Sequence, residues 1–217
     1  MTSILGISAG FHDAAAAVVD QHGDILFAGH SERYSKIKND ANIHRDLLMD
    51  AWHSVGGEVG TIAYYETPWK KRLRQWYSGQ GIEWDKLSVR KIITEQMHPM
   101  DVSHIPIKNY SHHLSHAAAG FQTSPYDRAT VVVIDAIGEF DTISIWGAEY
   151  DSKGRAKYTR LWGQKYPHSI GLFYSAITQR VGLHPLDEEY ITMGMSAWGK
   201  PHWYQKMHGE LIADDAQ

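Results

Sequence analysis

Residues 3–30 read SILGISAGFHDAAAAVVDQHGDILFAGH, and they contain three short apolar runs separated by turn residues. The runs cover residues 4–8, 14–20 and 25–29, with Gly10 and the pair Gly23-Asp24 between them. The second gap, at residues 21–24, is typical of a β-hairpin. We therefore predict that the chain opens with a three-stranded antiparallel meander.

Apolar periodicity beyond the meander predicts helices and strands in mixed order. The predicted elements are a helix in 40–55, a strand at 61–65, helices in 85–97 and 112–121, strands at 130–135, 142–150 and 158–163, and a helix in 169–181. The second of these three strands is expected to pair with the first across a turn at 138–141. A β-β-β-α-β-α order followed by a second hairpin is the plan of a ribonuclease-H-like lobe of the actin, Hsp70 and hexokinase class. This fold class is α/β, with a mixed β-sheet and flanking helices.

One segment, residues 69–84, is basic and aromatic and has no clear period. Its core is the run KKRLRQWY at residues 70–77, which offers both cations and stacking surfaces for a substrate or a nucleic acid. Charged runs are more commonly solvated. We therefore expect this segment to be the edge of a solvated loop.

Composition excludes several classes of function. The chain has 217 residues, and 21 Lys plus Arg against 25 Asp plus Glu give a net charge of −4. That balance argues against nucleic-acid binding through bulk charge. There is no cysteine, so disulfides, thiolate metal sites and cysteine nucleophiles are excluded. The chain has neither a leader pattern nor an apolar run of about 20 residues, so we expect a cytoplasmic protein without a membrane span.

A candidate metal site is suggested by the 14 histidines, two of which are His112 and His116. On a helix, residues four apart lie on one face, and two imidazoles so placed form half of a divalent-metal site. A carboxylate is the usual third ligand, and Asp135 ends the most apolar strand of the chain. We predict that these three side chains converge. The alternative is that the two histidines are ordinary helix residues.

Three other segments contain candidate functional residues. His12 and Asp13 follow the first strand, where they either face a central cleft or form a simple turn. Residues 31–38 mix one acid with three bases after the third strand, which suits an anion-binding edge or a solvated loop. Glycines between residues 171 and 199 allow a ligand close to the backbone, or they mark turns around a methionine-rich core.

Taken together, these segments resemble the N-terminal domain of the carbamoyltransferase family, which includes nodulation-factor and antibiotic O-carbamoyltransferases. The pieces that carry the resemblance occur in family order along nearly the whole chain. They are ILGIS at 4–8 with His12-Asp13, Glu32-Arg33 with Lys36 and Lys38, HHLSHA at 112–117, Asp135 with Gly138-Glu139, GLFY at 171–174 with Thr178, and Met193-Gly194 with Gly199.

The resemblance implies a Kae1-like domain whose histidine pair and aspartate bind a divalent metal, often iron, that contacts nucleotide phosphate. By this likeness His112, His116 and Asp135 are metal ligands, and His12 and Asp13 are catalytic residues near the carbamoyl and phosphate groups. The residues implied in binding ATP or carbamoyl adenylate are Glu32, Arg33, Lys36, Gly138 and Gly194. The implied reaction transfers a carbamoyl group, made available from carbamoyl phosphate and ATP, to a hydroxyl or amine of a small-molecule acceptor.

Members of the family are longer than this chain, and they include a second lobe and a YrdC-like domain. We therefore expect residues 1–165 to be the first lobe and residues 166–217 to be a helical segment leading toward the second. Activity is expected to need a complementing C-terminal polypeptide, and a homodimer is the other expected partner. A threonylcarbamoyl transferase-like tRNA-modification protein, a non-catalytic binding remnant and a metal-dependent hydrolase are the alternatives.

Overall fold

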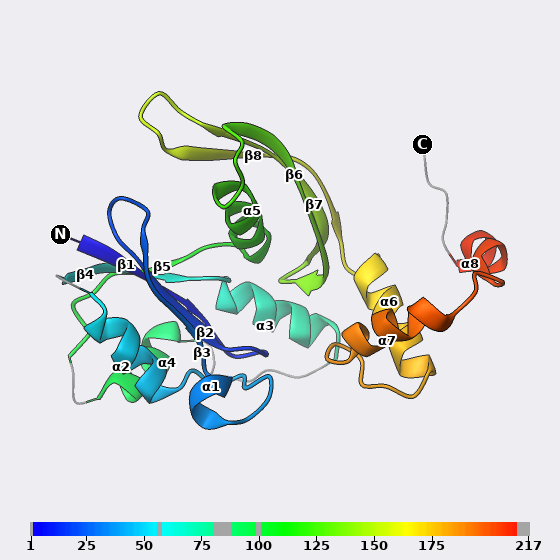
Figure 1. Cartoon of the computed structure of the whole chain (residues 1–217), viewed down its shortest axis with the longest axis horizontal. Helices are drawn as coiled ribbons and strands as arrows, with labels where there is room; N and C mark the ends of the chain where they lie inside the picture. The colour runs from blue at the N-terminus through cyan, green and yellow to red at the C-terminus, as the bar shows by residue number, and fades with distance from the viewer. Residues whose placement is uncertain (1, 56–57, 80–87, 99–100, 212–217) are drawn as a thin grey trace.

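Two separate β-sheets form the framework of the molecule (Figure 1). The computed structural model describes residues 2–55, 58–79, 88–98 and 101–211. The first sheet has five strands in the order β3-β2-β1-β4-β5, and the second has three in the order β6-β7-β8. The α/β class predicted from the sequence is therefore confirmed.

The first sheet contains the predicted meander. β1 pairs antiparallel with β2 and parallel with β4, while β3 and β5 form the two outer strands. The strand bounds are β1 Thr2–Ser8, β2 Ala15–Val19, β3 Ile25–His30, β4 Glu58–Tyr64 and β5 Ile107–Asn109. A meander joined to parallel strands beside β1 is the mixed sheet of a ribonuclease-H-like lobe.

One face of this sheet forms the main hydrophobic core. Alternate residues of each strand point inward, so that Leu5, Val18 and Ile62 are almost fully buried. Two helices cover them, α2 (Arg45–His53) and α4 (Val89–Met97). The sequence predicted a helix over 85–97, of which residues 85–87 lie outside the described part of the chain. A short helix, α1 (Glu32–Ser35), follows β3.

The second sheet packs against helix α5 (His112–Gln122), which lies along one of its faces (Figure 1). Its strands are β6 Arg128–Gly138, β7 Asp141–Tyr150 and β8 Ala156–Lys165. The predicted hairpin is confirmed, since Gly138 pairs with Asp141 at the turn. The strands of residues 1–165 thus belong to two sheets, and their assignment to a single lobe stays a prediction.

Helix α3 (Pro68–Tyr77) corrects the expectation of a solvated loop edge at 70–77. Pro68 occupies the first turn, where its missing N–H costs nothing. The backbone N–H of Thr67, at the N-cap, donates to Glu139 Oε1 at 2.7 Å. The helix also buries Lys71, Arg72 and Arg74, which the sequence placed in solvent. Residues 80–84 lie outside the described part of the chain.

The C-terminal helices extend away from the two sheets (Figure 1). They are α6 Ile170–Arg180, α7 Glu189–Met195, the 3-10 helix Ser196–Trp198 and α8 Tyr204–Leu211. Helix α6 was predicted; the Ser169 hydroxyl caps it by accepting from Leu172 N–H, and Gly182 follows with a φ of 90°. None of the described helices has the length and apolar character needed to cross a membrane.

Candidate metal centre

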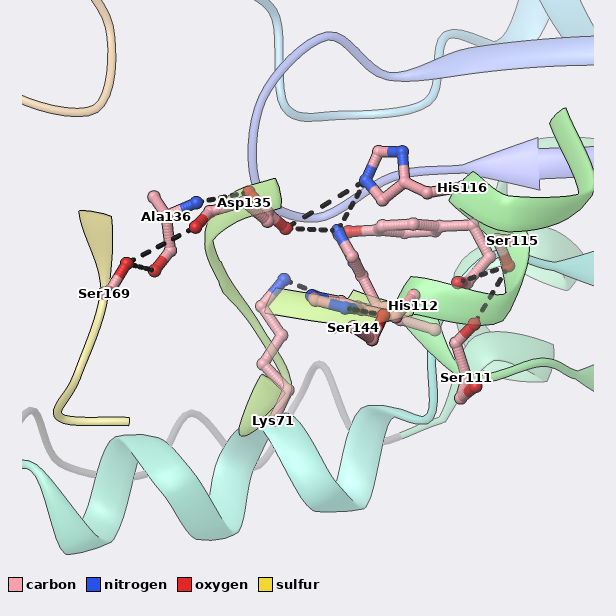
Figure 2. Close-up of polar contacts among 12 residues, drawn as sticks. Lys71, Ser111, His112, Ser115, His116, Asp135, Ala136, Ser144 and Ser169 are labelled. Atoms are coloured by element: carbon pink, nitrogen blue, oxygen red, sulfur yellow. Dashed lines mark hydrogen bonds and ion pairs between the residues drawn. The ribbon is translucent and has the colours of Figure 1, made fainter. Parts of the chain in front are cut away.

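Helix α5 and strand β6 bring His112, His116 and Asp135 together, as the sequence predicted (Figure 2). The two histidine Nε2 atoms are 3.0 Å apart. Oδ2 of Asp135 lies 2.9 Å from Nε2 of His112 and 4.0 Å from Nε2 of His116. The potential ligand atoms all lie within 4.8 Å of one another.

These separations fit a shared divalent ion. Ligand atoms about 2.0–2.2 Å from one ion lie about 3–4 Å from each other at ordinary coordination angles. Two imidazoles and one carboxylate form a donor set that first-row divalent metals accept, with further coordination positions left open. Nδ1 of His112 is buried, and no described residue hydrogen-bonds to it. The outer hydrogen bond typical of metal-bound imidazoles is therefore not made by the described residues.

The electrostatics of the cluster favour the ionised form of Asp135 and the neutral form of His116. Burial tends to raise the pKa of Asp135, but hydrogen bonds from His112 and from the Ala136 N–H outweigh it, and this pKa is lowered. Partial burial and the neighbouring His112 lower the pKa of His116. A neutral imidazole and an ionised carboxylate are the protonation states that bind metals.

Close packing orients the two adjacent histidines of α5. His113 is buried, and its Nδ1 lies 2.6 Å from the Ser144 hydroxyl, which anchors α5 to β7. Gly138 lies against the His112 ring, where an added Cβ would be 2.8 Å from Cγ of His112 and 2.9 Å from Cδ2 of His113. Only a glycine leaves room here, so Gly138 has a packing role beside the metal centre.

A second candidate pair, His12 and Asp13, follows β1. Nδ1 of His12 donates to Oδ2 of Asp13 at 2.8 Å. Asp13 has a φ of 49°, a left-handed conformation that aspartate tolerates better than most residues. Because Nδ1 carries the proton in this bond, Nε2 of His12 keeps its lone pair and can accept a proton.

A cavity of about 650 Å³ contains both groups. His12, Asp13, His112, His116 and Asp135 all line it. Other parts of its wall come from the residues that follow β4, from α3, from α6 and from residues 186–190. The five residues to which the family resemblance assigns catalytic or metal-binding roles therefore line one cavity, near the carboxyl ends of β1 and β6, where ligands of α/β proteins collect.

The residues predicted to bind the nucleotide are placed differently. None of Glu32, Arg33, Lys36, Gly138 and Gly194 lines the cavity. Glu32 accepts from the backbone N–H of Asn39, and Lys36 donates to the carbonyl of Arg33. Their part in nucleotide binding stays a prediction.

The cavity also contains charged residues that the sequence analysis did not assign. Glu66, Lys71 and Arg74 line it, and all three are buried. The basic run 70–77 was the available signal, but its lack of apolar periodicity favoured a solvated loop.

The fold and the site together define an α/β protein with a mixed sheet, a two-histidine, one-aspartate cluster and an adjacent His-Asp pair in one cavity. The family profile described as "Carbamoyltransferase N-terminus" matches residues 70–216. The chain belongs to this family.

Relatives of known sequence are considerably longer than this chain. The protein sll1178 of Synechocystis is 32% identical, over 98% of this chain and 37% of its own length. The nodulation protein NolNO of Sinorhizobium fredii is 28% identical, over 88% of this chain and 28% of its own length. The chain thus spans about a third of each of these relatives.

Among solved structures, YeaZ from Pseudomonas aeruginosa is similar with a TM-score of 0.41 at 10% identity. The match covers 77% of this chain and 68% of that one.

Proposed function

We propose that this chain supplies the metal-binding side of a carbamoyl transfer site. The observation that carries the proposal is the convergence of His112, His116 and Asp135 in a cavity shared with His12, within a chain of the carbamoyltransferase family. The proposed donor is carbamoyl phosphate activated with ATP as carbamoyl adenylate, and the acceptor is a hydroxyl or amine of a small molecule.

His112, His116 and Asp135 would hold the metal, for which Fe²⁺ suits a two-histidine, one-carboxylate donor set. A bound divalent ion supplies positive charge to phosphate oxygens or to the carbamoyl carbonyl. The remaining chemistry belongs to the chain itself. His12 Nε2 takes the proton from the acceptor as its oxygen or nitrogen bonds to the carbamoyl carbon, and the bond from that carbon to the phosphate oxygen breaks. Asp13 holds the required tautomer of His12.

The chain covers about a third of its relatives, so we propose that turnover requires the remaining polypeptide. In this proposal residues 1–165 form the first lobe, and residues 166–217 lead toward a second.

Purified chain should not transfer a carbamoyl group by itself. Mixed with a polypeptide that covers the rest of a relative, it should modify an acceptor, and His12→Ala should abolish this activity. Mass spectrometry of the acceptor detects the product. No transfer in the complemented mixture, across a panel of hydroxyl and amine acceptors, would contradict the proposal.

Metal binding is tested separately with Asp135→Asn. The neutral amide oxygen of asparagine is a weaker ligand than a carboxylate, so the loss of charge at Asp135 should weaken binding of Co²⁺ about 100-fold or more. The visible absorption of Co²⁺ and calorimetry both report it. Asp24→Asn, in the exposed β2–β3 turn, makes the same chemical change away from the site and should bind Co²⁺ like the unmodified protein. Equal affinity of the two variants would exclude Asp135 as a ligand.

A further inference from the structure

Helix α3 exposes most of its large apolar side chains and buries three of its cations. Its apolar residues are largely exposed: Trp69 58%, Leu73 47%, Trp76 62% and Tyr77 71%. Its cations are buried instead, with exposed fractions of 5% at Lys71, 5% at Arg72 and 7% at Arg74. Lysine and arginine are rarely buried so fully unless they are paired, because removing a charge from water is costly. Glu66 pairs with Lys71 and also attracts Arg74, and neither arginine lacks a partner, so the cations of α3 face acidic groups and the cavity instead of solvent.

Lys71 reaches into the cavity from α3 (Figure 2). Its Nζ donates to Oε1 of Glu66 at 3.0 Å and lies 4.9 Å from the centroid of the Phe11 ring. A lysine ammonium has three N–H donors, and Glu66 provides the one carboxylate that Lys71 meets among the described residues. Donors of Lys71 consequently remain for a molecule in the cavity.

Arg74 lies three residues further on and lines the same cavity. Residues three apart share one face of a helix, so Lys71 and Arg74 form one wall. Burial lowers the pKa of both side chains, and although Glu66 counteracts this, Arg72 lowers both further. An anion placed against this wall would favour the charged form of each group. A negatively charged ligand would therefore stabilise the charged forms of Lys71 and Arg74, which a neutral ligand would not do.

We propose that Lys71 and Arg74 form a binding site for the phosphate group of a ligand in this cavity. The planar fork of an arginine pairs with two phosphate oxygens, and a lysine adds a point charge. The inference rests on the proposed function in that it assigns part of the same cavity. The phosphate belongs either to a nucleotide or to an acyl phosphate, and both present the same tetrahedral anion.

The test measures anion binding by calorimetry with EDTA present, so that no metal contributes. The probes are inorganic pyrophosphate, AMP, acetyl phosphate and uncharged adenosine. Lys71→Met should weaken binding of the phosphate probes about tenfold or more, whereas Lys71→Arg should retain most of it. Adenosine should bind equally to all variants. Tighter binding of AMP than of acetyl phosphate identifies a nucleotide source, and the reverse order identifies an acyl phosphate.

The matched control is Lys91→Met, which removes one lysine from the exposed face of α4. It should bind the phosphate probes like the unmodified protein. Lys71→Met leaves Glu66 buried without its partner, so the double variant Glu66→Gln/Lys71→Met is measured as well. The proposal is overturned if either variant binds pyrophosphate as tightly as Lys91→Met, or if the unmodified chain binds none of the phosphate probes. Normal phosphate binding without carbamoyl transfer in the complemented mixture would contradict the proposed function alone.

Discussion

Two glycines that carry the family resemblance, Gly138 and Gly194, differ in the space around them. An added Cβ at Gly138 would press on the rings of His112 and His113, while one at Gly194 would meet no atom within 4 Å. Gly138→Ala should therefore lower the free energy of unfolding by about 1–3 kcal/mol and also weaken Co²⁺ binding. Gly194→Ala lies within helix α7 and should raise stability by up to about 1 kcal/mol.

Denaturant unfolding and Co²⁺ calorimetry on the two variants measure both effects. If Gly138→Ala kept full metal affinity, this glycine would not be needed to orient His112. If Gly194→Ala weakened nucleotide binding without loss of stability, the nucleotide-binding role implied by the family resemblance would regain support.

The convergence of His112, His116 and Asp135 was predictable from sequence because much of its geometry is local. Two histidines four apart share a helix face, and Asp135 directly follows the apolar run of residues 131–134 within β6. The nucleotide-binding role of Glu32 and Lys36 stays a prediction. The polar groups of Glu32 and Lys36 bond to nearby backbone, and sequence does not distinguish a charged side chain that binds its own loop from one that faces a ligand.

At the scale of elements, strands and amphipathic helices followed from their periodicity, but α3 did not. The period-3.6 rule assumes that apolar side chains face inward. In α3 the buried positions are cations and the exposed ones are aromatic, so the pattern pointed to a solvated loop. The buried Glu66 and the cap from Glu139 stabilise this orientation, and both lie outside the helix.

The turn between β7 and β8 provides a prediction for the dependence of stability on pH. Hydrogen bonds from the backbone N–H groups of Arg155 and Lys153, and the Arg155 guanidinium, lower the pKa of Asp151 from 3.8 to about 2. A lowered pKa in the folded state stabilises the protein above the unfolded value, and the effect is lost as the pH falls from about 4 through 2. Asp151→Asn should therefore be less stable than the unmodified protein at pH 6.

This difference should shrink as the pH is lowered from 4 toward 2. Urea unfolding at pH 6, 4 and 3 measures it, and carbon NMR of the carboxyl group follows the titration directly. Ser152→Ala, in the same turn, changes no carboxylate, so its effect on stability should not vary with pH. An Asp151→Asn difference of equal size at pH 6 and pH 3 would show that the charge of Asp151 does not stabilise the turn.

At the scale of the whole molecule, the cavity joins segments that are distant in sequence. Lys38 donates to the hydroxyl of Tyr190 at 2.7 Å, and Asn39 donates to Asp187, so the loop after α1 contacts the first turn of α7 and the residues before it. Thr67 and Glu139 similarly connect α3 to the β6–β7 turn. Such contacts depend on how the elements pack, and no local pattern encodes them. The sequence therefore indicated the groups at the site but not the walls around them.

The C-terminal helices leave several apolar side chains exposed to solvent. Exposure reaches 84% at Trp198, 65% at Trp203 and 64% at Met193. Exposed apolar groups that lie together usually mark an interface or cause aggregation. This chain spans about a third of its relatives, which agrees with an interface for the remaining polypeptide or for a second copy.

We therefore expect the purified chain to self-associate or to bind an apolar dye at micromolar concentration. The double variant Trp198→Ser/Trp203→Ser should reduce both effects and leave the melting temperature nearly unchanged, because both side chains are already in water. Tyr126→Ser removes an aromatic of 63% exposure from the turn before β6 and is the matched control. Light scattering and dye fluorescence provide the measurements.

A monomer that binds no dye would mean that the exposed side chains do not act as one surface, and the homodimer would then be excluded. Restored monodispersity on adding the complementing polypeptide would instead identify that polypeptide as what covers them.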